Sequence, residues 1–211
     1  MKKKCILCGG GSAVFFSEKE IDYYKCGSCA CIFMDPAYRL VPEKEKQRYE
    51  EHNNDITDAG YRKFVSPVTE RIQKNFSSAN RGLDFGAGTG PVISAMLAEN
   101  GYNVEIYDPF FAPDASKIEE KYDYIACCEV IEHFYDPKKE FALLRSMLAP
   151  GGQLFCMTLF YDEKTDFSKW FYKNDPTHVV FYHKKTIEYI KDEFDFASAG
   201  IHGRLAVFNA G

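Results

Sequence analysis

The sequence predicts an α/β protein in which a small cysteine-rich module precedes a doubly wound, mostly parallel sheet with an antiparallel last strand. Three observations support this prediction. Five of the eight cysteines lie in the first 31 residues, a glycine-rich turn follows the apolar run at 82–85, and strand-like and helix-like segments alternate from Arg81 onward. We therefore divide the chain into a module at 1–40, a helical connector at 41–80 and an α/β domain at 81–211.

The composition is that of a folded protein and gives little support to a polyanionic partner. Of the 211 residues, 45% are hydrophobic and 16% aromatic, which is enough to bury a core. The net charge of −5 is unevenly spread, because residues 1–50 carry 9 basic and 7 acidic side chains and the rest carry 17 and 24. This thin positive charge favours ordinary surface solvation over a nucleic-acid interface.

Neither a membrane span nor a secretory signal is expected. The longest uncharged stretch, residues 146–161, is interrupted by Pro150, Gly151 and Gly152 and is too short to cross a bilayer. The basic residues at 2–4 are not followed by the sustained apolar run of a signal peptide. The prediction is therefore a cytoplasmic protein.

The cysteines of the module have the spacing of a zinc site. Cys5 and Cys8 form one Cys-x-x-Cys pair, and Cys26 and Cys29 form a second one after 17 intervening residues. One tight turn per pair aims both thiolates at a single ion, which a small module without a large core needs. A closed four-thiolate site of this zinc-ribbon-like kind is structural. Two alternatives stay open: Cys31 in place of Cys29, and free thiols in a small hairpin.

The connector starts with a charged stretch and ends in an amphipathic helix. The residues Tyr61, Phe64, Val65, Val68 and Ile72 recur with helical spacing and would share one face.

The α/β domain alternates strands and helices along its length. Strands are expected at 82–85, 103–107, 122–128 and 153–159, helices at 91–100, 138–148 and 184–191, a short helix from residue 129, and a closing antiparallel pair at 195–198 and 204–208. Strands separated by helices pair in parallel, which predicts a Rossmann-like sheet.

The turn after the first of these strands is the most informative part of the chain. Its glycines follow a Gly-x-Gly-x-Gly pattern that lets the backbone turn sharply and approach a ligand. Asp108 ends the next strand, where a carboxylate can accept hydrogen bonds from both hydroxyls of a ribose. A dinucleotide fingerprint would need glycine where Pro91 stands. The pattern predicts a cofactor that contains a nucleoside.

Here the chain resembles the class I S-adenosylmethionine-dependent methyltransferases, over residues 81–208. The motifs that carry the resemblance are Asp84-x-Gly-x-Gly-x-Gly90, Asp108, the strand at 122 with Glu129-Val-Ile-Glu132-His133, and Leu148-Ala-Pro-Gly-Gly-Gln-Leu-Phe155. The resemblance implies that S-adenosylmethionine contacts the glycine turn, binds Asp108 through its ribose and borders the end of the strand at 122–128.

The resemblance also assigns the individual cofactor residues. Those in the turn and at the strand ends are Asp84, Gly86, Ala87, Gly88, Gly90, Asp108, Cys128, Glu129 and Val130. Tyr61 and Phe64 would cover the cofactor, with core packing as an equally good explanation.

One departure from the family concerns the adenine side. Only 14 residues separate Asp108 from Asp123, too few for a helix, a strand and their loops. The family's third strand and its adenine-contacting residue are therefore expected to be shortened or absent.

Three histidines, His133, His178 and His183, are candidates for the chemistry, and His133 and His178 are our catalytic assignments. Glu129, Glu132 and His133 would share one helix face. This string resembles the divalent-metal site of some family members, including terminal small-RNA 2′-O-methyltransferases and polyprenyl-phenol O-methyltransferases, with His178 as an additional ligand. A base role for either histidine and a purely structural role are the alternatives.

An aromatic stretch precedes the last helix. Its members are Trp170, Phe171, Tyr172, Phe181 and Tyr182. They would stack a flat acceptor or a nucleobase, or would form a lid packed on the sheet.

The leading hypothesis is S-adenosylmethionine-dependent methyl transfer to a small-molecule acceptor, with a structural zinc ion in the N-terminal module. An RNA methyltransferase is the alternative within the enzyme class, because a zinc ribbon ahead of this domain resembles certain ribosomal-RNA guanine methyltransferases. The rival from another class is a non-catalytic regulatory protein that binds the cofactor. No membrane partner is expected.

Overall fold

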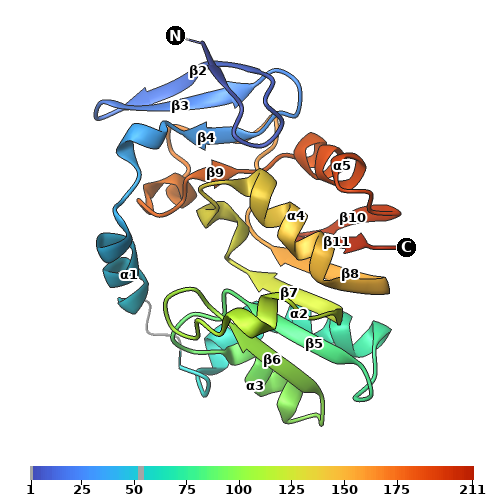
Figure 1. Cartoon of the computed structure of the whole chain (residues 1–211). Helices are drawn as coiled ribbons and strands as arrows, with labels where there is room; N and C mark the ends of the chain where they lie inside the picture. The colour runs from blue at the N-terminus through green and yellow to red at the C-terminus, as the bar shows by residue number, and fades with distance from the viewer. Residues whose placement is uncertain (1, 52–54) are drawn as a thin grey trace.

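Two sheets organise the chain in the computed structural model, which describes residues 2–51 and 55–211 (Figure 1). Residues 52–54 of the predicted connector lie outside that description. One sheet has five strands in the order β1-β2-β3-β4-β9, and the other has six in the order β10-β11-β8-β7-β5-β6. Within the described ranges, no helix is both long and apolar enough to cross a membrane.

The strands are short and divide between the two sheets. The five-stranded sheet contains β1 (Lys2–Lys4), β2 (Gly11–Glu18), β3 (Ile21–Cys26), β4 (Ile32–Met34) and β9 (Val180–Phe181). The six-stranded sheet contains β5 (Arg81–Phe85), β6 (Asn103–Tyr107), β7 (Tyr122–Cys128), β8 (Leu148–Met157), β10 (Ser198–His202) and β11 (Leu205–Asn209).

The helices fall into longer α segments and single 3₁₀ turns. The α-helices are α1 (Pro42–Glu50), α2 (Ala59–Asn75), α3 (Val92–Ala98), α4 (Pro137–Met147) and α5 (Lys184–Glu193). The 3₁₀ turns are η1 (Pro36–Tyr38), η2 (Ala115–Ile118), η3 (Ile131–His133) and η4 (Phe171–Asn174).

The six-stranded sheet confirms the predicted α/β class. Strands β6, β5, β7 and β8 are parallel, and β11 is antiparallel to β8. Helices α2 and α3 pack on one face through Val65, Ile72 and Leu97, whereas α4 and α5 contribute Phe141 and Ile187 to the other. Covering both faces explains why the central strands are almost uniformly apolar.

The segment after β6 has the predicted shortening. Between Asp108 and Tyr122 the described chain forms a bridge from Asp108 to Ala112 and the turn η2, without a further strand. β6 is consequently the edge of the sheet on this side.

Two strand boundaries differ from the sequence prediction. β8 starts at Leu148 instead of Gln153, because the Pro-Gly-Gly segment forms an irregularity inside the strand, with Gly151 at a φ of +73°. β10 covers Ser198–His202 instead of 195–198, because Asp195 adopts a φ of +53° and the chain is still leaving α5.

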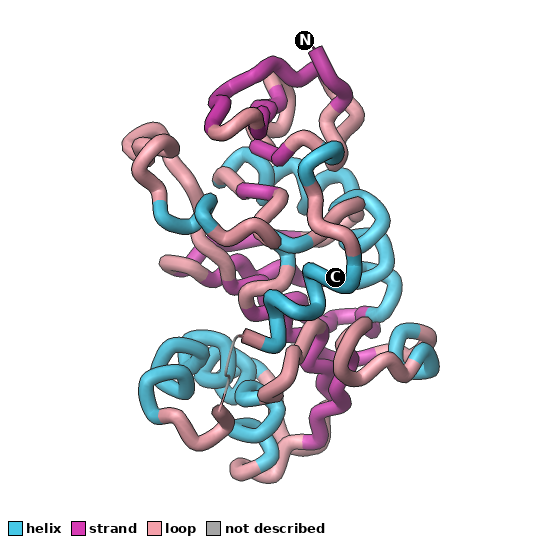
Figure 2. The backbone as a smooth tube through the Cα atoms, turned by 90° about the vertical axis from the view of Figure 1, so that its left-hand side faces the viewer, coloured by secondary structure: helices cyan, strands magenta, loops and turns pink. Residues whose placement is uncertain are grey.

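The cysteine-rich module is continuous with the rest of the protein. β4 pairs with β9, so residues 180–181 of the predicted α/β domain complete the sheet of the module. Thr186 in α5 donates a hydrogen bond to the carbonyl of Cys29 at 2.9 Å. The side chain of Lys173, only 2% exposed, pairs with Glu18 in β2 at 2.7 Å. Figure 2 shows the module above the α/β domain from a second direction.

Candidate active site

The glycine turn between β5 and α3 forms one wall of the site. Gly86 has a φ of +74°, and its N–H donates to the carbonyl of Tyr107 at 2.8 Å. A Cβ atom built on Gly86 would lie 2.6 Å from the side chain of Val130, so only glycine fits this approach of the two strand ends.

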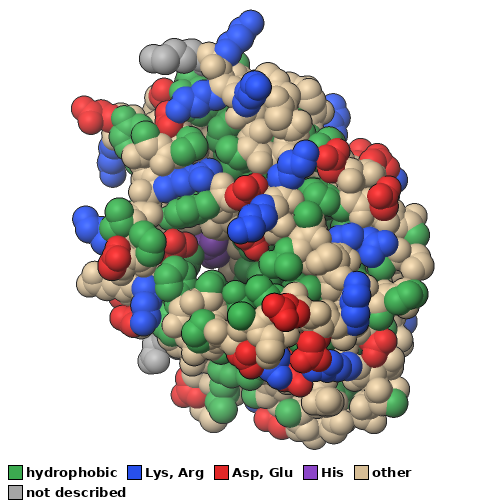
Figure 3. Space-filling view, viewed as in Figure 1, with side chains coloured by type: hydrophobic (Ala, Val, Ile, Leu, Met, Phe, Trp, Pro, Cys, Tyr) green, Lys and Arg blue, Asp and Glu red, His purple; other side chains and the backbone are tan. Residues whose placement is uncertain are grey.

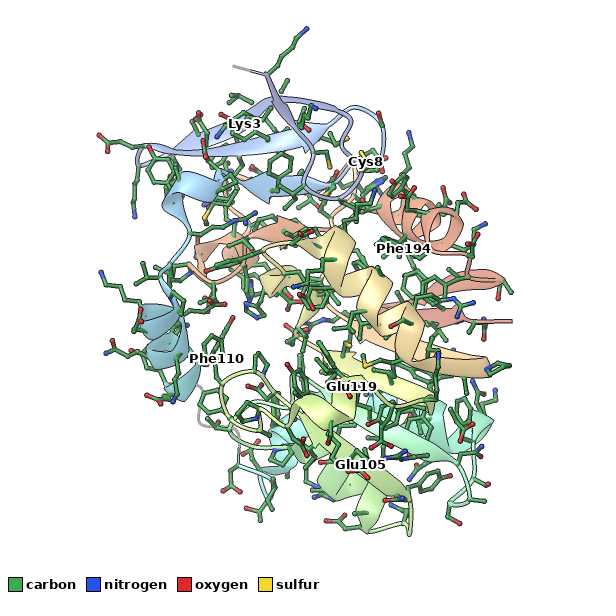
Figure 4. All side chains as sticks on the ribbon, in the orientation of Figure 1. Lys3, Cys8, Glu105, Phe110, Glu119 and Phe194 are labelled. Atoms are coloured by element: carbon green, nitrogen blue, oxygen red, sulfur yellow. The ribbon has the colours of Figure 1, made fainter. Side chains whose placement is uncertain are left out.

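Asp108 closes this wall from the end of β6. One carboxylate oxygen accepts the N–H of Gly88 at 2.9 Å, and the other accepts the N–H groups of Phe110 and Phe111 at 2.8 and 3.0 Å. The carboxylate therefore faces the glycine turn across the β5–β6 boundary, where the sequence predicted a ribose contact. Figure 4 shows Phe110 on the loop that follows, facing α1.

A cavity of about 1140 Å³ opens along these strand ends. The cavity is lined by all the residues predicted to bind the cofactor and by His133 and His178, the two residues assigned to catalysis. Figure 3 shows the hollow on this face of the molecule with a histidine visible inside it. Because pockets for single small ligands measure about 300–1,000 Å³, the cavity has room for a cofactor and a small acceptor.

Tyr61 and Phe64 lie in this wall on α2. Their rings are stacked with centroids 5.8 Å apart, and both rings line the cavity. Burial raises the pKa of the Tyr61 phenol. The rings are placed to cover a ligand, and Phe64 is also packed against the core of α2 and α3.

Helix α1 supplies cavity residues that the sequence did not predict. The Tyr49 ring lies edge-on to His133 with centroids 5.2 Å apart, and it also contacts Phe110. Arg48 pairs with Asp175 at 2.8 Å and so ties α1 to the segment before His178. In the sequence, the α1 segment is a charged stretch of the connector, and it contains no motif that would have predicted these contacts.

The predicted aromatic stretch divides between the cavity and the core. Phe171, 69% exposed, and Tyr172 line the cavity. Trp170 packs against the core, and Phe181 and Tyr182 are buried in it.

Glu129 and Glu132 do not share a helix face, which corrects the sequence prediction. Glu129 has a φ of +52° and precedes η3, whose single turn contains Glu132 and His133. The Tyr172 hydroxyl lies within hydrogen-bond distance of both carboxylates and donates its single hydrogen between them. Burial raises the pKa of Glu132 to about 7 and, together with the charge of Glu132, that of Glu129 to about 8.

His133 and His178 are oriented by backbone carbonyls. His133 Nδ1 lies 2.9 Å from the carbonyl oxygen of Thr177, and His178 Nδ1 lies 2.7 Å from that of Tyr172. A carbonyl only accepts, so each Nδ1 carries a hydrogen and donates it.

Glu132, His133 and His178 form a compact group. One ligand atom from each lies within 4.8 Å of the others. Glu132 is fully buried, and its Oε2 has no hydrogen-bond partner among the described residues. His183, the third candidate, lies outside the cavity, where its Nδ1 accepts the N–H of Lys185 at the start of α5.

The four cysteines of the two Cys-x-x-Cys pairs also come together. Cys5 and Cys29 have sulfurs 3.7 Å apart, and those of Cys8 and Cys26 are 3.3 Å apart. Tetrahedral zinc with bonds of about 2.3 Å separates its sulfurs by about 3.8 Å, so the donor set fits this ion. Cys31 is fully buried but is not in the group of four.

Asp84 leads to a prediction about the pH dependence of stability. It accepts the N–H of Ser94 at 3.1 Å, and burial raises its pKa from 3.8 to about 7. The folded chain therefore binds this proton more tightly than the unfolded chain, and the free energy of unfolding falls as pH rises from 3.8 through about 7. The shift corresponds to at most about 4 kcal/mol.

Asp84→Asn removes this titration. Urea unfolding at about pH 5 and pH 8 should show a smaller loss of stability in the variant than in the wild type. Equal losses in the two proteins would show that Asp84 does not titrate in this range.

Comparison with known proteins gives a family and a set of partial relatives. The sequence model of a family described as a methyltransferase domain matches residues 49–198. Ubiquinone biosynthesis O-methyltransferase of Erwinia tasmaniensis is 30% identical over 84 residues, which are 40% of this chain and 35% of that protein. The namesake from Pseudomonas savastanoi is 35% identical over 79 residues, 37% of this chain and 34% of the relative. The chain thus spans about a third of the length of the curated relatives it matches.

Solved structures share the fold at low sequence identity. A methyltransferase from Archaeoglobus fulgidus, described as S-adenosylmethionine-dependent, aligns with a TM-score of 0.52 and 21% identity over 66% of this chain and 71% of its own. The phosphoethanolamine N-methyltransferase 2 of Haemonchus contortus aligns with a TM-score of 0.56 and 19% identity over 77% of this chain and 44% of its own. At these identities the likeness concerns the fold alone.

Proposed function

Because this chain belongs to the methyltransferase domain family, we propose that it transfers the methyl group of S-adenosylmethionine to a small-molecule acceptor. The observation that carries the proposal is one cavity of about 1140 Å³ that is lined by the glycine turn and Asp108 and also by His133 and His178, with which the buried Glu132 is grouped. A cofactor half and a reaction half are thereby adjacent.

The cofactor half suits a nucleoside with an amino-acid tail. Gly86, where a Cβ atom would collide with Val130, lets the glycine turn pack against the end of β7 in the cavity wall. The Asp108 carboxylate would accept both ribose hydroxyls, the glycines and the β7 end (Cys128–Val130) would border the rest, and Tyr61 and Phe64 would cover it.

The reaction half must hold the acceptor in line with the methyl group and take its proton. When bound, S-adenosylmethionine supplies an electrophilic methyl group on sulfur; the acceptor atom bonds to that carbon as the carbon–sulfur bond breaks. His133 and His178 line the cavity in this region, and either ring, in its neutral form, would accept the proton released by the acceptor.

A divalent cation is a second candidate feature of the reaction half. The buried Glu132 Oε2, which has no hydrogen-bond partner among the described residues, and one ring nitrogen each of His133 and His178 fit a cation, and these three side chains would hold it. Such an ion would lower the pKa of an acceptor hydroxyl.

The cysteine group would hold a structural zinc ion. Four thiolate ligands would leave zinc no open coordination position, so the ion would stabilise the module and would not take part in the reaction.

The acceptor class follows from the position of the basic residues. Lys2–Lys4 form β1, at the opposite edge of the five-stranded sheet from β9 and the cavity. Near the cavity mouth, acidic side chains such as Glu45, Asp136 and Glu140 accompany Arg48 and Lys139. This mixed charge favours a small molecule over RNA.

Calorimetric titration with S-adenosylhomocysteine tests the proposal, with NAD as the control ligand. We expect one-to-one binding of S-adenosylhomocysteine in the micromolar range and none of NAD. Folded, zinc-loaded protein that binds neither ligand would refute the proposal. Binding without methyl transfer to any member of a broad acceptor panel would favour the regulatory alternative.

A further inference from the structure

We propose that Arg204 keeps Glu129 out of the cation site, so that a divalent ion in the reaction half is held by three protein side chains instead of four. This inference rests on the cation site of the proposed function. It concerns the one acidic residue of the Glu-x-x-Glu-His string that the fold places outside the compact group of Glu132, His133 and His178.

Both oxygens of Glu129 are engaged elsewhere. Its Oε1 accepts from Arg204 Nη2 at 2.9 Å, and its Oε2 accepts from the Tyr172 hydroxyl at 3.1 Å. The backbone of Glu129 has a φ of +52°, and its N–H donates to the carbonyl of Met157 at 2.8 Å. A left-handed conformation at a non-glycine residue persists only where the surroundings fix it, so the backbone of Glu129 is fixed, and the contacts with Arg204 and Tyr172 set the direction of its side chain.

Arg204 is anchored for this role. It lies in the turn between β10 and β11, and its carbonyl accepts the N–H of Thr158 at 3.0 Å. Its guanidinium lies 4.6 Å from the centroid of the Phe64 ring. Its Nε is buried without a hydrogen-bond partner in the described chain, and its side chain, 36% exposed, pairs with Glu129 through Nη2 at 2.9 Å.

Glu132 differs from Glu129 in its ion pairing and in the hydrogen bonding of its carboxylate oxygens. It is fully buried, makes no ion pair among the described residues, and has an Oε2 without a hydrogen-bond partner. The Tyr172 hydroxyl contacts both carboxylates, so a single hydroxyl separates Glu129 from the group. Removing Arg204 would therefore let the Glu129 carboxylate turn toward the cation.

The number of ligands has chemical consequences. One carboxylate and two neutral imidazoles give the ion one negative charge and leave several coordination positions for acceptor oxygens or water. A second carboxylate would bind the ion more tightly and would occupy one of those positions. The nitrogen-rich set also favours Mn²⁺, Fe²⁺, Co²⁺ or Zn²⁺ over Mg²⁺.

The test is a Mn²⁺ titration of full-length protein that carries one equivalent of zinc per chain, with free Mn²⁺ measured by electron paramagnetic resonance. Mn²⁺ prefers oxygen and nitrogen ligands and leaves the four-thiolate site to zinc. We expect Glu132→Gln to weaken binding at least about thirtyfold, and Glu129→Gln to stay within about threefold of the wild type. Arg204→Met should tighten binding at least about fivefold.

Two controls separate ligation from a general charge effect. Lys139→Met removes another cation from the cavity wall and should change Mn²⁺ affinity less than about twofold. In Arg204→Met, water-proton relaxation by bound Mn²⁺ should also fall, because Glu129 replaces a coordinated water. The double variant Arg204→Met/Glu129→Gln should return to the affinity and relaxation of the wild type.

The possible outcomes distinguish this inference from the proposals beneath it. An equal loss of affinity in Glu129→Gln and Glu132→Gln would establish four ligands and overturn it, as would unchanged binding in Arg204→Met. Wild-type protein that binds S-adenosylhomocysteine but not Mn²⁺ would remove the cation site, and this inference with it, while the methyltransferase proposal would stand.

Discussion

Replacing Asp108 by alanine is expected to weaken S-adenosylhomocysteine binding by at least a hundredfold. The variant loses the carboxylate that would accept both ribose hydroxyls, and charge-assisted hydrogen bonds contribute about 1.5–3 kcal/mol each. It also frees the N–H groups of Gly88, Phe110 and Phe111, which now hold the loop beside the cofactor half. Calorimetric titration measures the loss.

Asp114→Asn is the matched control for this experiment. Asp114 is exposed, lies in the same connection after β6 and bonds only to the N–H and hydroxyl of Ser116. Its variant should bind S-adenosylhomocysteine with wild-type affinity. Native stability and undiminished affinity in Asp108→Ala would exclude Asp108 from the ribose site.

Replacing Cys26 by serine is expected to release zinc and unfold the module. The wild type should contain one zinc ion per chain, measured by plasma mass spectrometry on protein purified without chelators. The loss in the free energy of unfolding should be at least about 4 kcal/mol, because binding a structural zinc ion is largely folding free energy. It should extend to η4 and α5, which the module contacts through Lys173 and Thr186.

Cys31→Ser is the control for the metal site. Cys31 is as buried as the proposed ligands, but its sulfur contacts the carbonyl of Ile32 at 3.7 Å and lies outside the group of four. This variant should keep one zinc ion per chain. Loss of zinc from Cys31→Ser with retention in Cys29→Ser would instead make Cys31 the fourth ligand.

Local sequence patterns predicted much of the cofactor half. Gly86 and Asp108 follow β5 and β6 directly, so once the strands are recognised the parallel sheet brings both to one edge. The 14-residue gap after Asp108 likewise predicted the missing third strand, because chain length alone excludes it. The approach of the cysteine pairs followed from their spacing.

The reaction half depends on contacts that no local pattern contains. Tyr49 reaches His133 from a helix about 80 residues earlier, and Arg204 reaches Glu129 from a hairpin near the other end of the chain. The helical prediction for the Glu129–His133 string was wrong because Glu129 takes a left-handed backbone conformation, which its residue type does not favour. Tertiary packing overrides local preference at these places.

The pairing of β4 with β9 has a consequence for folding during synthesis. Ile32 in β4 pairs with Phe181 in β9. The β3–β4 hairpin is synthesised early, but β9, which covers its edge, is made only near the end of translation. Such a contact closes a loop of about 150 residues, which slows folding. Until then the apolar β4 edge is exposed to other nascent chains, and early zinc capture by the four cysteines would hold the hairpin in register during that interval.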